Sequence, residues 1–270
     1  MERNKIDSSK LQGEEFEIIE NLKETTKSLP TKEAMQKEMD ENRVIPVFNA
    51  EATSVDDIYP LFNIVPKKIF ESIRVDFLDP SLPANEQLNK LPYVNSRYLF
   101  KKLSSNNSEN AQQQEKLRII YYVSCLMGLY SFRRLRSKDK LADSFTHQPS
   151  NLVIDEMLSK FTVLSGNKKS FTMDPINEDK LLSFMLALAL KLDDYRVEVQ
   201  PLAQELSLKT SKLTGIFRSL GCVIKNIPAA EAKSLGLSKS AAASYKIASL
   251  TVPFKVPEVA RRRGGMQQRR

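Results

Sequence analysis

Histidine, cysteine and glycine are scarce in this sequence of 270 residues, which has one histidine, two cysteines and eight glycines. The single histidine, His147, has no nucleophile beside it, so a surface or capping role is favoured over catalysis. The sequence contains no Gly-rich phosphate loop, no Cys/His set with the spacing of metal ligands and no Ser-His-Asp arrangement. We therefore predict a protein that is not an enzyme and that needs no cofactor and no metal.

Long apolar runs are absent as well. No stretch reaches the ~18 apolar residues of a membrane span, and no basic-then-apolar leader opens the chain, so we expect neither secretion nor a membrane partner. The longest apolar block, Leu181–Leu192, fits a buried helix. Cys125 and Cys222 lie within apolar helical patterns, and a single disulfide between them could not stabilise a chain of this length. They are predicted to be reduced core residues of an intracellular protein.

Positive charge is concentrated at one end of the chain. The formal net charge is +8, yet residues 209–270 hold thirteen Lys and Arg against Glu231 and Glu258, a local balance of 13 − 2 = +11. The remaining residues therefore sum to 8 − 11 = −3. Such a cluster favours a polyanionic partner, because phosphates attract Lys and Arg over long range and binding releases counterions. A solvated face or a basic tail without a partner explains the cluster equally well.

The first part of the chain divides into two segments. Residues 1–42 are polar and lean acidic, with helical spacing in places. Residues 43–110 are punctuated by prolines, which block long helices and leave short extended and helical pieces. Apolar side chains run through this second segment, so we expect it to be an extended linker that lies along the surface of a partner protein.

A compact unit is predicted over residues 111–175. The pattern indicates a long buried helix from about Glu115, a short helix over DKLADSF, and a third helix whose first residue is Pro149. Leu152, Met157, Leu158 and Phe161 lie at helical spacing in that third helix and are expected in the core. FTVLSGNKKSFTM then reads as a β-hairpin.

Residues 176–258 repeat this order without repeating the sequence. A long apolar helix is followed by the strand candidate EVQ, a short helix from Pro201, and a third helix that ends before Gly221, where a left-handed cap is expected. Its inward face is predicted to carry Leu213, Ile216, Phe217 and Leu220. CVIKNIP and SYKIASLTVPF supply two strands joined by a long loop of small residues.

Three helices closed by a hairpin form the winged-helix variant of the helix-turn-helix. The predicted fold class is therefore mainly α with small β-hairpin wings (α+β), as tandem winged helices behind an extended linker, with a basic tail over 259–270. From the pattern alone, DNA binding and protein binding are equally good uses of such units.

Candidate DNA contacts follow from the placement of hydrogen-bond donors on the third helix and on the wings. In the second unit they are Lys209, Thr210, Ser211, Lys212, Arg218, Lys225 and Lys246. In the first unit Lys168 and Lys169 lie at the tip of the wing. Further candidates are Arg133, Arg134 and Arg136 between the first two helices, where a solvated helix end explains the charges equally well, and Arg261, Arg262 and Arg263 in the tail. The outer face of the third helix carries no Asn or Gln, so contact with phosphates is favoured over reading of bases.

Several stretches resemble a known family. EATSVDDIYPLFNIVP, PYVNSRYLFKKL and LTVPFKVPEVARRR, in this order around two winged helices, resemble the C-terminal half of the A49-type subunit of RNA polymerase I. Its tandem winged helix is similar to that of the β-subunit of the general factor TFIIE. The resemblance covers about residues 43–263. Nothing in residues 1–42 resembles the dimerisation module that the family carries further upstream, so we expect a fragment or a shortened form.

The resemblance implies a non-catalytic polymerase subunit, located in the nucleus and nucleolus. It would bind DNA without sequence preference near the polymerase cleft and support initiation and elongation of ribosomal RNA synthesis. Implied partners are the core subunits of RNA polymerase I, DNA, the initiation factor of that polymerase, and the family's heterodimer partner only where the upstream module is present. Polymerase contact is expected through the linker, at Tyr59, Leu61, Phe62, Ile64, Tyr93 and Tyr98. The alternative is a winged-helix scaffold that binds only protein.

Overall fold

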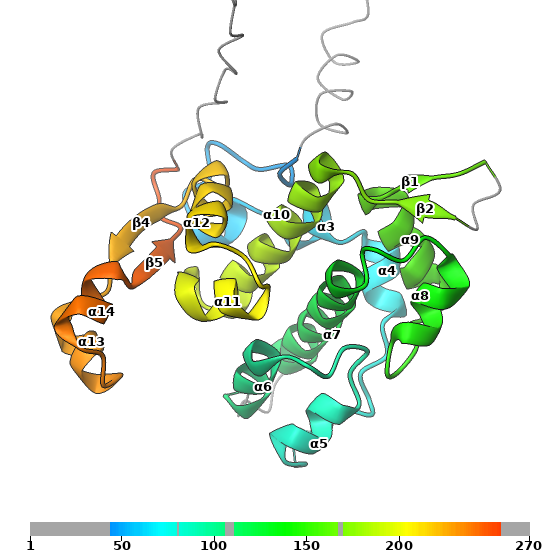
Figure 1. Ribbon diagram of the computed structural model, residues 1–270, viewed down its shortest axis with the longest axis horizontal. Coiled ribbons are helices and arrows are strands. Elements are labelled where there is room, and N and C mark those ends of the chain that lie inside the picture. The colour runs from blue at the N-terminus through cyan, green and yellow to red at the C-terminus, as the bar shows by residue number, and fades with distance from the viewer. Residues whose placement is uncertain (1–43, 80, 106–110, 167–169, 255–270) are drawn as a thin grey trace, which may run out of the picture. The chain divides into compact units, whose positions relative to one another are not determined.

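Two long helices, α7 (Ala111–Ser131) and α10 (Pro175–Leu192), pack against each other in the computed structural model (Figure 1). The structure describes residues 44–79, 81–105, 111–166 and 170–254. Helix α10 begins where the Asp174 side chain accepts a hydrogen bond of 2.7 Å from the Asn177 amide. Every residue from Leu181 to Leu190 is buried, because the helix is apolar on all sides and other elements surround it.

The first winged-helix unit follows the predicted order. Helix α7 leads to α8 (Lys138–Ser144), α9 (Asn151–Phe161) and the antiparallel pair β1 (Val163–Leu164) and β2 (Phe171–Thr172). An isolated antiparallel bridge between Ser137 and Ser170 adds a third segment, one residue long, to this small sheet. Figure 1 shows α8, α9 and the hairpin on one side of the α7–α10 pair.

Two predictions for α9 are wrong. The helix begins at Asn151 and not at Pro149, because the Ser150 hydroxyl accepts a hydrogen bond from the Val153 amide and so caps it. Leu152 is 53% exposed and does not join the core. Leu152 lies nine residues before the buried Phe161, which is about two and a half helical turns, so the two side chains are on opposite sides of α9, whereas Val153 and Ile154 of the same first turn are buried.

The second unit is built from α10, β3 (Arg196–Glu198), α11 (Val199–Glu205), α12 (Thr210–Ser219), β4 (Val223–Asn226) and β5 (Lys246–Ser249). The three strands form an antiparallel sheet in the order β3-β5-β4, so the strand predicted over residues 198–200 begins two residues earlier. Leu213, Ile216, Phe217 and Leu220 are buried as predicted. Gly221 has φ of +79°, which confirms the left-handed cap after α12.

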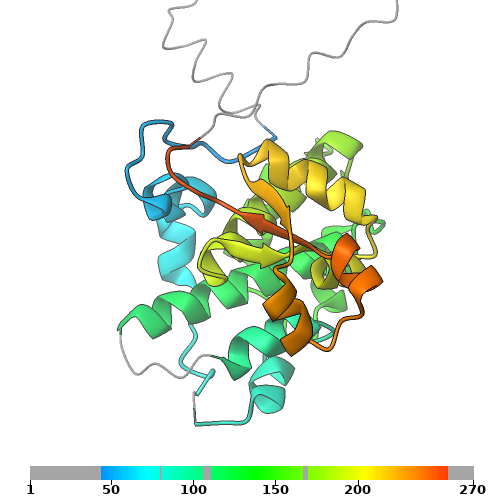
Figure 2. The ribbon, with the colours of Figure 1, turned by 90° about the vertical axis from the view of Figure 1, so that its left-hand side faces the viewer.

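The long loop predicted between β4 and β5 is wrong. It contains two short helices, α13 (Ala229–Ser234) and α14 (Lys239–Ser244), at the end of the hairpin (Figure 2, orange). Alanine is the best helix former, and the Ser238 side chain caps α14 by accepting from the Ala241 amide. Ile227, Ala232 and Ile247 form a small core of their own beneath these helices.

The fold class predicted from the sequence is confirmed: the structure is mostly helical, with small antiparallel strand pairs. Both units place a strand or bridge after the first helix and a hairpin after the third. This is the winged-helix order. Among the described residues, no helix is both long and apolar enough to cross a membrane.

Residues 44–105 correct the prediction of an extended linker. This segment, which we call the strap, folds into short elements on the two units (Figure 1, blue to teal). They are η1 (Val55–Asp57), α3 (Leu61–Ile64), α4 (Lys67–Ser72), α5 (Ala84–Asn89) and α6 (Arg97–Ser104). Pro60, Pro66 and Pro83 stand at the N-caps of α3, α4 and α5, so the prolines start short helices as well as interrupting long ones.

Cys125 and Cys222 are buried and unpaired, as the prediction of core residues requires. Burial raises the pKa of the Cys222 thiol to about 12 and that of Cys125 further still, so neither forms a reactive thiolate near neutral pH. His147 lies at the surface, and its Nε2 is 2.8 Å from the carbonyl oxygen of Asn89.

Candidate nucleic-acid interface

Helix α12 has a core face and a basic outer face. Lys209, Ser211 and Arg218 are exposed and Thr210 is half-buried, on the side away from the buried leucine and phenylalanine. Among the described residues, the side chains of Lys209 and Arg218 form no hydrogen bond or ion pair. Lys209 is also the N-cap of α12 and provides no side-chain acceptor for the first amides of the helix. This helix end is therefore open to an external anion.

Lys212 is engaged within the molecule. Its Nζ lies 3.1 Å from Oδ1 of Asp179 and 3.5 Å from Oε1 of Glu178, both on α10. Partial burial by itself lowers the pKa of Lys212, but the two carboxylates outweigh that effect and the pKa is raised. Lys212 is thus a charged lysine that already has an anionic partner.

Arg133 of the first unit reaches the same carboxylate. Its Nε is 3.9 Å from Oε2 of Glu178, its Nη1 donates to the carbonyl of Tyr130 at 2.8 Å, and its guanidinium lies 4.3 Å from the centre of the Tyr130 ring. We call Tyr130, Arg133, Glu178, Asp179 and Lys212 the seam cluster, since they join α7, α10 and α12. The two carboxylates could not be predicted as part of the site from the sequence, because they are far from both cations along the chain.

The other predicted DNA contacts occupy separate positions. Arg134 and Arg136 are exposed after α7, and neither side chain has a partner among the described residues. Lys225 is exposed on β4 and Lys246 is half-buried on β5. Lys168, Lys169, Arg261, Arg262 and Arg263 lie outside the described residues.

The third helix of the first unit, α9, has a different outer surface. It exposes Leu152 and Asp155, and Asp155 pairs with Lys138 at 2.5 Å. Lys160 turns inward: its Nζ donates to the carbonyl of Ile64 in the strap at 2.8 Å and lies 4.4 Å from the centre of the Phe184 ring. Burial lowers the pKa of Lys160 to about 8. Helix α9 therefore presents no free cation comparable to those of α12.

The structure also locates the residues predicted to contact the polymerase. Tyr59, Leu61 and Ile64 are buried in the core of this chain, and the Tyr59 hydroxyl donates to the carbonyl of Leu220 at 3.0 Å. The prediction of a partner contact through these three side chains is wrong, because the winged helices themselves cover the apolar surface of the strap. Phe62 is 52% exposed, and Tyr93 and Tyr98 are half-buried.

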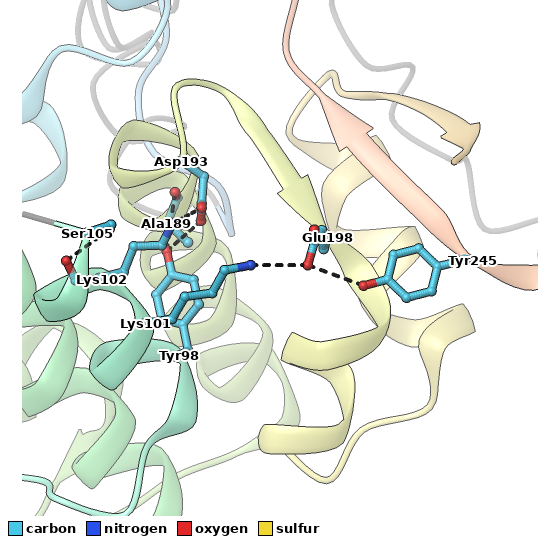
Figure 3. Close-up of polar contacts among 8 residues, drawn as sticks. All are labelled: Tyr98, Lys101, Lys102, Ser105, Ala189, Asp193, Glu198 and Tyr245. Atoms are coloured by element: carbon cyan, nitrogen blue, oxygen red, sulfur yellow. Dashed lines mark hydrogen bonds and ion pairs between the residues drawn. The ribbon is translucent and has the colours of Figure 1, made fainter. Parts of the chain in front are cut away.

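Polar contacts hold helix α6 of the strap on the second unit (Figure 3). The Tyr98 hydroxyl donates to Oδ2 of Asp193 at 2.7 Å, and Lys102 pairs with the same carboxylate. Burial and the charge of Asp193 raise the pKa of Tyr98 well above its usual value. Further along, Glu198 accepts from Lys101 at 3.5 Å and from the Tyr245 hydroxyl at 3.2 Å. The strap is thus fixed to β3 and to the end of α10 by charge-assisted contacts.

A cleft of about 440 Å³ lies between α6 and the β3–α11 segment. Its lining includes the carboxylates Asp193, Glu198 and Glu205, and each of them is bonded within the chain. Glu205, for example, accepts from the Tyr98 amide at 2.8 Å, at the first turn of α6. No group of three His, Cys, Asp or Glu suited to a metal occurs among the described residues.

Comparison with known proteins identifies the family. Residues 1–257 match the family described as "A49-like RNA polymerase I associated factor". The chain is 40% identical to "DNA-directed RNA polymerase I subunit RPA49" of Saccharomyces cerevisiae over 272 residues, which cover 98% of this chain and 65% of the yeast protein. It is 30% identical to subunit rpa49 of Schizosaccharomyces pombe over 264 residues, or 96% of this chain and 61% of that relative. It therefore spans less than two thirds of the length of these two relatives. The chain belongs to the A49-like RNA polymerase I associated factor family.

Proposed function

We propose that this chain is a non-catalytic subunit of RNA polymerase I that binds DNA without sequence preference through its second winged helix. In this role it supports the initiation and elongation of ribosomal RNA synthesis, in the nucleus and the nucleolus. The family supports the polymerase part of the proposal, since the relatives from both yeasts carry the name of a polymerase I subunit.

The main support for DNA binding is the basic outer face of α12. Lys209 and Arg218 are exposed and have no partner among the described residues, and the first turn of the helix has no side-chain cap. Phosphates are attracted by such cations and by free amides at a helix N-terminus. The face carries no Asn or Gln to read an adenine edge, so binding independent of sequence is expected.

Contact with the polymerase core is assigned to the side chains of the strap that stay accessible. Phe62 and Phe100 are 52% and 38% exposed, and Tyr93 and Tyr98 are half-buried. Aromatic residues are enriched at protein interfaces, because they offer a large apolar area at a small cost in side-chain entropy. The initiation factor of polymerase I remains a proposed partner, and the family heterodimer partner remains one only where the upstream module is present.

A protein-binding scaffold without DNA contact is the second candidate. Its support is the apolar surface that the first unit and the strap leave open, at Leu152 and Phe62, which are 53% and 52% exposed. This candidate predicts that the basic face of α12 is only solvated.

The test is a fluorescence anisotropy titration of the full chain against two labelled duplexes of unrelated sequence. If the proposal holds, both duplexes bind equally, and the logarithm of the binding constant falls linearly with the logarithm of salt concentration between about 50 and 200 mM. Absence of binding at micromolar protein and low salt would refute the DNA part and leave the scaffold.

A further inference from the structure

We propose that Arg133 and Lys212 form one composite phosphate-binding site at the seam of the two winged helices, and that the Glu178 carboxylate occupies this site as an internal anion. Glu178 then weakens DNA binding, because a phosphate must displace it before it can bind both cations. This inference rests on the proposed DNA binding by the second unit and assigns to the first unit one residue of the same binding surface.

The geometry converges on Glu178 from two helices. One carboxylate oxygen is 3.5 Å from Nζ of Lys212, on α12, and the other is 3.9 Å from Nε of Arg133, at the end of α7. The Tyr130 hydroxyl lies 3.5 Å from the same oxygen that faces Lys212. Two cations that come from different winged helices thus surround a single anionic group.

A phosphate can take the place of the carboxylate in the same surroundings. It offers more oxygens than the carboxylate, and the guanidinium of Arg133 can bind it with two parallel hydrogen bonds. The Tyr130 ring, 4.3 Å from the guanidinium carbon, and the Tyr130 carbonyl already orient that group. Binding of phosphate would therefore require little rearrangement of Arg133.

The cluster is accessible enough for exchange. The side chains of Glu178, Arg133 and Lys212 are 26%, 31% and 41% exposed. Ion pairs at this level of exposure contribute little to folding stability, so replacing the internal anion by an external one does not threaten the fold. Asp179, at 3.1 Å from Lys212 and 46% exposed, adds a second carboxylate that repels an approaching phosphate.

Position along α12 connects the site with the proposed interface. Lys212 stands one turn after Lys209, at the end of the helix where the amides lack a side-chain cap. A backbone that lies on the free cations of α12 can therefore continue to the seam and contact the first unit there. Arg133 would be its contact in the first winged helix.

Glu178→Gln is the direct test, because glutamine keeps the size of the side chain and an acceptor for Tyr130 while it removes the charge. The affinity of the full chain for a labelled duplex should rise about three- to tenfold, and the salt dependence should steepen by about one counterion. The matched control is Glu86→Gln on α5, an exposed carboxylate with the same change in charge and no partner among the described residues. Its effect should stay within about twofold.

A second variant removes one cation of the site. In a Lys212→Met background, the gain from Glu178→Gln should fall below about twofold, since one of the two phosphate ligands is missing. Thermal unfolding of each variant verifies that it is folded, and Asp179→Asn replaces Glu178→Gln if that variant does not fold.

The outcomes separate this inference from the proposed function. If the unmodified chain binds no DNA, the proposed function fails and the site fails with it. If the unmodified chain binds DNA but Glu178→Gln binds equally or more weakly, or no better than the Glu86→Gln control, the composite site is refuted alone. A gain that persists in the Lys212→Met background refutes it as well.

Discussion

The two winged helices share an order of elements but present different third helices to their surroundings. Helix α12 exposes Lys209 and Arg218 without partners among the described residues, whereas α9 exposes Leu152 and an Asp155 that is already paired. The comparison shows that the fold provides a scaffold, and that the outer side chains of one helix decide what each unit can bind.

The strap reinforces this difference. It contacts α9 through α4, and the carbonyl of Ile64 accepts a hydrogen bond from Lys160. At α12, the Tyr59 hydroxyl donates to the carbonyl of Leu220, at the C-terminal end of the helix and thus at the opposite end from the exposed N-cap Lys209. The strap thus takes up a lysine of the first unit and leaves the basic face of the second unit accessible.

The largest expected difference between the two units is the effect of charge reversal on DNA binding. Lys209→Glu with Arg218→Glu should reduce affinity for duplex DNA about ten- to a hundredfold and lower the salt dependence by about two counterions, because each cation neutralises one phosphate. Anisotropy titrations measure both quantities.

Arg134→Glu with Arg136→Glu is the matched pair on the first unit, with the same change in charge at exposed positions. We expect a loss of about two- to fivefold. Equal losses from the two pairs would contradict the assignment of the main interface to α12.

Alanine substitution of one helical glycine in each unit should show how differently the two helices are packed. A Cβ on Gly128 of α7 would lie 2.2 Å from Cε1 of Phe145, whereas a Cβ on Gly215 of α12 would meet no heavy atom within 4 Å. Gly128→Ala should therefore lower the free energy of unfolding by about 1–3 kcal/mol through overpacking. Gly215→Ala should raise it by up to about 1 kcal/mol, since alanine is the better helix former.

Urea denaturation of the full chain measures both glycine changes. Circular dichroism confirms that each variant keeps its helical content before unfolding. An unchanged or raised free energy of unfolding for Gly128→Ala would show that Phe145 can move away from α7 without cost, and would contradict the close contact in the first unit.

The smallest expected effect concerns the buried lysine of α9. The pKa of Lys160 is about 8 in the folded protein, below its usual 10.5. Between these two values the unfolded chain binds more protons, so this lysine makes stability rise with pH, by less than about 1.4 kcal/mol per pH unit. Lys160→Met should remove that rise.

The measurement is the free energy of unfolding of the unmodified chain minus that of Lys160→Met, followed from pH 7 to 10.5. Lys140→Met, on the exposed face of α8, is the control and should show no such dependence on pH. If the free energy of unfolding changes with pH in the same way for the unmodified chain and for Lys160→Met, the pKa of Lys160 is not lowered in the folded state.

Much of the second unit could be predicted from local pattern. The spacing of Leu213, Phe217 and Leu220 identified the buried face of α12, and Gly221 identified its end, because helical periodicity and a left-handed cap depend on residues close in sequence. Leu152 shows where the same reasoning failed: it lies about two and a half turns before Phe161 and therefore on the opposite side of α9, whereas Ile154, Met157 and Phe161 are in phase and buried.

The candidate site could be predicted only in part. Lys209 and Arg218 lie on the outer face as the spacing requires, yet the pairing of Lys212 and Arg133 with Glu178 has no local signal. Similarly, the apolar residues of the strap indicated that it packs on a surface, and only the fold shows that this surface belongs to the same chain.

The sequence by itself determined the order of the three main helices and the hairpin in each winged helix, the inward face of α12 and the concentration of basic residues toward the C-terminus, since these depend on propensity, period and composition. The tertiary structure alone decided that the strap buries Tyr59 and Ile64, that Lys160 turns inward and that two winged helices share Glu178. Burial and ion pairing depend on which segments, distant in sequence, pack together, and local sequence patterns do not reveal those contacts.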